Sequence, residues 1–263
     1  MQRAKQDYSA NQAIDQKDGV LGTSPSTKSS ERPTITGTAQ VVSYGMSEYN
    51  IETMLELPQI IEDIRTEFTA KNAVRDTTLN RSRELIRFCA LSIRAIHRHE
   101  WEEAEALLDT ARQAANVMTA DLAQYHDLYG AGYTQDALKE LVEAHTLYAM
   151  VHGHALPTPA SLGVPAAAYL NGLAEAASEL RRYILDLIRL GRTREGEPYL
   201  AVMDDVYIHL VTMDFPDALT GGLRRTTDML RGVLERTRGD LTVAVRQEEL
   251  EAAMQAFERH KTA

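Results

Sequence analysis

The sequence has one cysteine, few aromatic residues and no long apolar run. Because Cys89 is the only cysteine among 263 residues, an intrachain disulfide is excluded and a reducing compartment is expected. No apolar segment approaches the roughly 18 residues that a membrane-spanning helix needs, and the N-terminus lacks a signal-peptide pattern. These absences predict a cytoplasmic protein without a membrane partner.

Familiar catalytic signatures are missing as well. The chain contains no GxSxG motif, no glycine-rich phosphate loop and no CxxC pair, so acyl transfer, P-loop hydrolysis and zinc-ribbon sites have no support. Cys89, within RFCALS, is expected to be a small buried residue and not a nucleophile. The histidines that lack HExxH or ExxH spacing are expected at the surface or at helix ends; they are His97, His99, His152 and His154.

The formal net charge of −10 argues against a basic surface that coats nucleic acid nonspecifically. It is compatible with a local basic site, because arginine clusters along the chain at 81–98, 181–194 and 224–231. Arginine suits bidentate phosphate contacts. The alternative is that these arginines lie on solvated helix faces, paired with the abundant Glu and Asp.

Ala, Leu, Glu and Arg dominate the chain beyond its first segment, and this composition predicts an all-α fold. Residues 1–46 are rich in Ser, Thr, Gln and Lys with little periodic hydrophobicity, so a disordered tail is expected there. Residues 47–263 are expected to form one helical domain. No internal repeat of about 20–50 residues is evident, which disfavours a solenoid.

Apolar residues at spacings of three and four predict seven helices. Glycine after the second and sixth helices, Thr134 before the third and proline near the start of the fourth and sixth supply start and stop signals. The expected helices are 57–99, 101–129, 134–151, 165–190, 197–213, 216–238 and 245–260.

Two pairs of glutamates lie on consecutive predicted helices. Glu140 and Glu143 are three residues apart, and Glu175 and Glu179 are four apart, so each pair shares one helix face. If the helices pack together, four carboxylates converge and require protons or a metal ion to offset their repulsion. Oxygen ligands of this kind suit Mg²⁺ or Mn²⁺. The alternative is a solvated acidic stripe beside Lys139.

Neighbouring residues favour convergence of the four carboxylates. The face that carries Glu140 and Glu143 becomes apolar at Leu147, so its glutamates are expected at the rim of something buried. Small residues between 172 and 178 keep the next helix slim and permit a close neighbour. Arg182, three residues after Glu179, is placed to orient that carboxylate or to contact a phosphate.

Several segments together resemble the translin superfamily, in particular its shorter prokaryotic members. They are SRELIRFCALSIRAIHRHEWEEAEALL, KELVEA, YLNGLAEAASELRRYILDLIRLG and DDVYIHL. The resemblance covers about residues 52–258 and is most specific from Tyr169 to Arg182. It implies a seven-helix translin-like bundle.

The family has two branches, and the resemblance implies a function for each. Translin binds RNA and single-stranded DNA, whereas translin-associated factor X contributes Mg²⁺-dependent endoribonuclease sites inside a closed, barrel-like oligomer. The acidic positions of the nuclease branch match Glu140, Glu143 and Glu179, while Glu175 stands where that branch has aspartate.

The resemblance therefore implies a homo-oligomeric endoribonuclease in which Glu140, Glu143, Glu175 and Glu179 bind Mg²⁺ or Mn²⁺ and act on RNA, and also on single-stranded DNA. Arg182 is the first candidate for phosphate contact, and the weaker candidates along the first helix are Arg87, Arg94 and Arg98. One alternative is a non-catalytic RNA- or DNA-binding protein. A less favoured one is an all-α nucleotide pyrophosphatase, whose acidic pairs lie three residues apart.

Overall fold

The computed structural model describes residues 56–262, which form an all-α bundle as predicted. No strand occurs among these residues. The predicted disordered tail, 1–46, and the expected domain boundary after it lie outside the described residues. Within the described part, no helix is long and apolar enough to cross a membrane.

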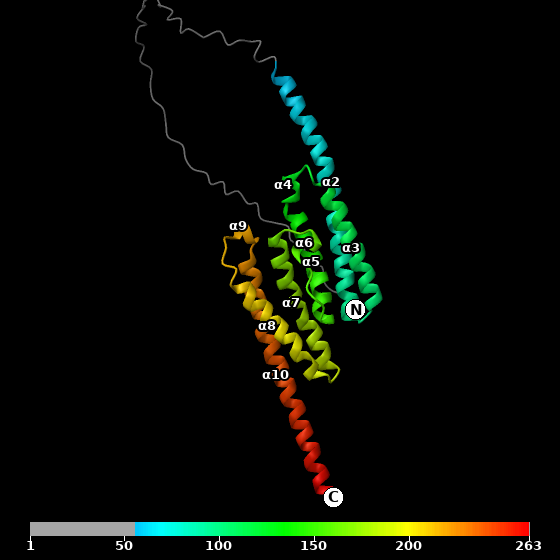
Figure 1. The fold of residues 1–263 in the computed structure, drawn as a ribbon, viewed down its shortest axis with the longest axis vertical. Coiled ribbons are helices and arrows are strands. Elements are labelled where there is room, and N and C mark those ends of the chain that lie inside the picture. Colours follow the sequence, from blue (N-terminus) through cyan, green and yellow to red (C-terminus); the bar gives the residue numbers. More distant parts are fainter. Residues whose placement is uncertain (1–55, 263) are drawn as a thin grey trace, which may run out of the picture. The chain divides into compact units, whose positions relative to one another are not determined.

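Six long helices build the bundle (Figure 1). Short helical turns join them: α4 (His126–Tyr129), α6 (Pro159–Leu162), η1 (Thr193–Gly196) and α9 (Asp217–Thr220). The long helices are α2 (Leu57–His97), α3 (Trp101–Asp121), α5 (Gly132–His152), α7 (Ala166–Arg189), α8 (Glu197–Val211) and α10 (Leu223–Thr262).

Two predicted helix boundaries near the site are wrong. The second helix ends at Asp121, and the residues up to Tyr129 form a turn and the short α4. The third begins at Gly132 with Ala131 in the cap position. Thr134 is not the cap, because it is buried and its hydroxyl donates a hydrogen bond to the Leu128 carbonyl, 2.8 Å away.

The predicted seventh helix and most of the predicted sixth form one continuous helix, α10, whereas the first residues of the predicted sixth helix form the separate short α9. The predicted stop at Gly239 is wrong, since the helix runs through that residue. Leu234 and Leu241, on either side of it, are buried in the core with Ile184 of α7. Burial of two leucines outweighs the roughly 1 kcal/mol by which glycine disfavours a helix interior.

The α5 and α7 backbones approach closely at Gly172. A Cβ atom at this position would lie 2.5 Å from the Lys139 carbonyl oxygen and 2.7 Å from the Val142 Cβ. Only glycine fits this contact without displacing the backbone of α5. The prediction that small residues let a neighbour pack closely on this helix is confirmed, and the contact lies one turn before Glu175.

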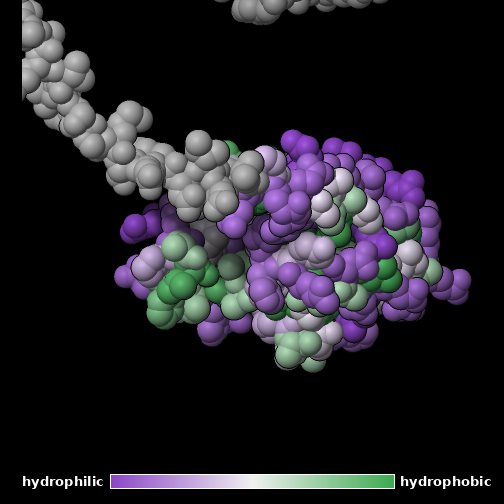
Figure 2. Space-filling view, turned by 90° about the horizontal axis from the view of Figure 1, so that it is seen from above, coloured by the Kyte–Doolittle hydropathy of each residue, from purple (hydrophilic) through white to green (hydrophobic). Residues whose placement is uncertain are grey.

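Two long helices extend past the rest of the bundle, α2 at its N-terminal end and α10 at its C-terminal end (Figure 1). Apolar side chains stay exposed on both extensions: Leu57, Ile60, Ile61, Ile64 and Phe68 on α2, and Val243, Leu250, Met254 and Phe257 on α10. On the face in Figure 2, hydrophobic residues also gather to one side of a mostly hydrophilic surface.

Candidate metal centre

Three carboxylates converge where α5 packs against α7. One oxygen each of Glu140, Glu143 and Glu175 lies within 4.8 Å of the other two. Glu140 and Glu143 occupy successive turns of α5, and the close contact at Gly172 brings α7 near enough for Glu175 to join them. We call these three residues the acidic triad.

The triad is partly withdrawn from water, and Glu143 is its most buried member. Burial, together with repulsion from Glu140, Glu175 and Glu179, raises the pKa of Glu143 to about 8. Burial also raises the pKa of Glu140, although the nearby Lys139 opposes the shift. The arrangement therefore favours protons or a cation among these carboxylates.

A cation from the chain itself already contacts the triad. The Lys139 ammonium group lies 2.8 Å from one carboxylate oxygen of Glu175 and 2.7 Å from the other, and 3.7 Å from Glu140 Oε1. Burial lowers the pKa of Lys139, but the bond to Glu175 and the charges of Glu140 and Asp136 outweigh it, so the pKa is raised overall. Lys139 stays charged beside the triad.

Glu179 lies next to the triad and not within it. Its carboxylate is 2.9 Å from Nε2 of His97, and this hydrogen bond is the main reason why the pKa of Glu179 is lowered. The His97 side chain, at the end of α2, is only 1% exposed. Its Nδ1 atom is buried and has no hydrogen-bond partner among the described residues. Three of the four predicted carboxylates thus share one point, and the fourth is held by a histidine.

Sequence reasoning missed the roles of His97 and Lys139. His97 was expected at the surface or at a helix end; it does end α2 but is buried. Lys139 was considered only as a neighbour in a solvated stripe. Its place directly before Glu140 gave no sign that its side chain reaches across to α7.

The four predicted arginines are all exposed, and one of them, Arg182, interacts with a predicted carboxylate. Arg182 is exposed, and its charge contributes after His97 to the lowered pKa of Glu179. Arg94 and Arg87 are exposed on α2, about 60° and 80° around the helix from His97 at 100° per residue. Arg98 is also exposed but is paired with Glu100 and, at 3.7 Å, with Glu103.

Cys89 is fully buried in α2 among apolar residues, as predicted. Burial raises the pKa of its thiol, so the thiolate is disfavoured and the residue has the properties of a structural cysteine.

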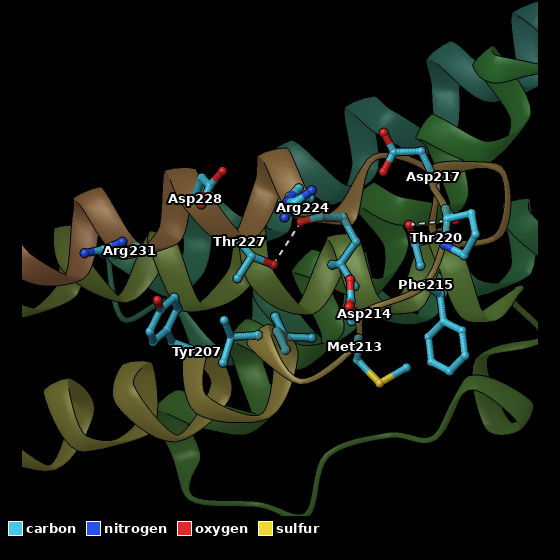
Figure 3. A pocket seen from close by; sticks show the side chains of 14 residues that line it. Tyr207, Met213, Asp214, Phe215, Asp217, Thr220, Arg224, Thr227, Asp228 and Arg231 are labelled. Carbon is cyan, nitrogen blue, oxygen red and sulfur yellow. Dashed lines mark hydrogen bonds between the residues drawn. The ribbon is translucent and has the colours of Figure 1, made fainter.

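Away from the triad, a large cavity lies between the C-terminal end of α8, the short α9 and the first turns of α10 (Figure 3). Its volume is about 800 Å³, and Tyr207, Phe215, Arg224 and Arg231 are among its lining residues. None of the triad carboxylates lines it. The triad combines converging carboxylate oxygens with a Glu143 pKa that is raised to about 8, so it is the better candidate for chemistry.

Comparison with known proteins gives relatives over most of the chain. The chain is 34% identical to AfC3PO, both in its crystal structure (TM-score 0.66) and in a complex with duplex RNA (TM-score 0.63). Each match covers 71% of this chain and 97% of that chain. A crystal structure of apo-NeC3PO, 18% identical with a TM-score of 0.64, shares the fold.

An uncharacterized protein from Methanocaldococcus jannaschii is 30% identical over 208 residues, 78% of this chain and 90% of that protein. No protein-family model matches. Identity of 34% across almost the whole of a C3PO chain, together with the shared helical fold, shows that this protein belongs to the translin superfamily.

Proposed function

We propose that this protein is a metal-dependent endoribonuclease that cleaves RNA at the acidic triad. The observation that supports this most is the convergence of Glu140, Glu143 and Glu175 within 4.8 Å, in a chain similar to a protein solved with duplex RNA. RNA is therefore the expected substrate class, and single-stranded DNA a second one.

The residues present fit a divalent cation. All three donors are carboxylates, the ligand type that Mg²⁺ and Mn²⁺ prefer. The raised pKa of Glu143 indicates negative charge that the protein leaves incompletely balanced, and a cation would relieve it. Glu140, Glu143 and Glu175 would hold the ion, with Glu179 beside them. A bound ion would supply Lewis-acid stabilisation of charge on a phosphodiester.

The surrounding residues would orient the carboxylates and the substrate. His97 fixes Glu179 through its 2.9 Å hydrogen bond, so this carboxylate is ionised and positioned without occupying the triad. In the metal-free protein Lys139 holds both oxygens of Glu175, the longer side chain that stands where the nuclease branch has aspartate, and an ion that binds Glu175 would displace this ammonium group. Arg182 is exposed beside Glu179 and suits a contact with a backbone phosphate.

A cleavage assay with matched variants tests the proposal. Purified protein is incubated with labelled single-stranded and duplex RNA, with Mg²⁺, with Mn²⁺ or with EDTA. Cleavage is expected only with the metal, and Glu140→Gln should reduce it at least a hundredfold, the usual order of effect for a group that stabilises transition-state charge. Glu102→Gln, on exposed α3 surface, is the control. Cleavage that survives EDTA or Glu140→Gln would contradict the proposal.

A non-catalytic RNA-binding protein is the second candidate, and the ion pair between Lys139 and Glu175 favours it. The ammonium group already satisfies one carboxylate of the triad, as a structural site would require. This candidate predicts salt-dependent RNA binding with no cleavage in either metal. The pyrophosphatase alternative has less support, because His97 binds Glu179 and because the chain belongs to the translin superfamily.

We also propose that the protein forms a homo-oligomer. The exposed apolar residues on the extensions of α2 and α10 recur at spacings of three, four and seven, which is the pattern of a helix face that packs on another helix. Light scattering at micromolar concentration should show an assembly, and Phe68→Glu combined with Phe257→Glu should shift it toward monomer. A wild-type monomer would contradict this proposal.

A further inference from the structure

A second cavity adjoins the acidic triad. It has a volume of about 420 Å³ and lies between the first turns of α5, α7 and α10. Lys139 and Glu175 form its border with the triad, and Arg225 lines it from α10. Its size is that of a site for a small molecule or for one nucleotide unit.

The wall of this cavity that comes from α10 is firmly positioned. The buried Asn171 side chain of α7 donates a 2.8 Å hydrogen bond to the Thr220 carbonyl and accepts a 2.6 Å one from the Thr226 hydroxyl. Gly221 and Gly222, with φ of +62° and +83°, make the turn into α10. These contacts fix the first turn of α10, and hence Arg225, against the helix that carries Glu175.

The charges around the cavity single out Arg225. Lys139 is bound to Glu175, and the remaining acidic residue, Asp136, is exposed. Arg225 is exposed as well, and no ion pair to it is found among residues 56–262. An unpaired guanidinium on a fixed turn beside a carboxylate site suits bidentate binding of a phosphate. The N-terminal end of the 40-residue α10 adds partial positive charge nearby.

We propose that this cavity is a phosphate-binding subsite, in which Arg225 binds the phosphodiester next to the one that is cleaved. The inference rests on the proposed function, because it takes the triad as the place of cleavage. Lys139 lines the same cavity and would add a second positive charge beside this phosphate. Arg225 acts here as a positioning residue for RNA.

Arg224 provides a matched control. It precedes Arg225 in the same turn of α10, about 100° around the helix, and lines the larger cavity instead (Figure 3). A variant at either position removes one exposed arginine from the same helix end, so the net charge and the helix propensity change equally. Only the variant at Arg225 alters the cavity beside the triad.

The first experiment measures binding of a single-stranded RNA to the full chain in EDTA, where no metal-dependent cleavage occurs. Arg225→Met should weaken binding about tenfold and reduce the slope of log K against log salt by about 0.7, the value for one lost phosphate contact on a single strand. Arg225→Lys should restore the slope. Arg224→Met should change affinity less than about twofold. If Arg225→Met and Arg224→Met lose RNA affinity by the same factor, the proposal is overturned.

The second experiment locates the contact. RNAs that carry one neutral methylphosphonate linkage are compared with unmodified RNA as substrates in Mg²⁺. A neutral linkage next to the cleaved one should raise the KM of wild type but should not raise the KM of Arg225→Met. If this linkage raises KM by the same factor in both proteins, the proposal is overturned. If wild type cleaves no RNA, the proposed nuclease function fails, and the binding experiment in EDTA still decides whether Arg225 contacts phosphate.

Discussion

The Lys139 ammonium group binds both carboxylate oxygens of Glu175, at 2.8 and 2.7 Å, across the contact between α5 and α7. It therefore neutralises one member of a carboxylate cluster from within the chain. The pair is partly buried, with side-chain exposures of 22% and 27%, so it is screened less than a surface ion pair. Any divalent ion that uses Glu175 as a ligand has to displace this ammonium group.

Lys139→Met should therefore strengthen Mn²⁺ binding, by about tenfold if displacement of the ammonium costs about 1.4 kcal/mol. Methionine keeps most of the side-chain volume and removes the competing charge. Titration calorimetry at pH 8.5 measures the change, because there more of the Glu143 carboxyl is ionised in both proteins.

Lys71→Met is the control for this measurement, since Lys71 pairs with Asp127 away from the triad. It should leave the affinity for Mn²⁺ unchanged. Weaker Mn²⁺ binding by Lys139→Met would show that the lysine supports the site instead of competing with the ion.

Glu143→Gln should stabilise the metal-free protein above neutral pH. The pKa of Glu143 is raised to about 8, so below about pH 4.5 the carboxyl is protonated in both the folded and the unfolded chain. Between about 4.5 and 8 it ionises more readily in the unfolded chain, which lowers stability as pH rises. Glutamine does not ionise, so the free energy of unfolding of Glu143→Gln should exceed that of wild type by at least about 1 kcal/mol at pH 8, which corresponds to about 2–4 °C in Tm.

Thermal unfolding in EDTA at pH 4 and pH 8 checks this expectation. The increase in Tm from Glu143→Gln should be present at pH 8 and smallest at pH 4. The control Glu102→Gln should have the Tm of wild type at both pH values. A gain of the same size at both pH values would mean that ionisation of Glu143 does not oppose folding.

The sequence was sufficient for the main helices because their apolar residues recur at helical spacing over many turns. It failed where a single residue was used as a boundary signal. Glycine is typical of the position after a helix end, but α10 continues past Gly239 because Leu234 and Leu241 on either side of it are buried in the core. Local propensity of about 1 kcal/mol is decisive only where tertiary packing does not oppose it.

The candidate site was predictable to the extent that it depends on helix faces. The spacing of Glu140 and Glu143, and the small residues before Glu175, predicted that α5 and α7 would bring carboxylates together. The positions of His97 and Lys139 depend on contacts between residues 82 and 36 positions apart. No periodicity within one helix records such contacts, so the division between the triad and Glu179 required the structure.

His97→Phe should raise the pKa of Glu179. Phenylalanine occupies the buried space at the end of α2 but cannot form the hydrogen bond that is the main cause of the lowered pKa. Carbon-13 NMR of the glutamate carboxyl groups across a pH titration reports the change. His97→Gln, which can still donate to Glu179, should retain more of the shift, and an unaltered Glu179 pKa in His97→Phe would assign the shift to Arg182.

Gly172→Ala should destabilise the protein and weaken the triad's affinity for Mn²⁺ together. The added Cβ would lie 2.5 Å from the Lys139 carbonyl oxygen, so α5 and α7 have to move apart at the turn that positions Glu175. Overpacking of this kind costs about 1–3 kcal/mol.

The matched control is Gly232→Ala in α10, where the new Cβ would meet only the mobile end of Arg236 at 3.6 Å. There alanine should stabilise the helix by about 0.5–1 kcal/mol. Thermal unfolding and Mn²⁺ titration of both variants measure the effects. If Gly172→Ala loses Mn²⁺ binding but keeps its stability, the contact between α5 and α7 positions Glu175 without stabilising the fold.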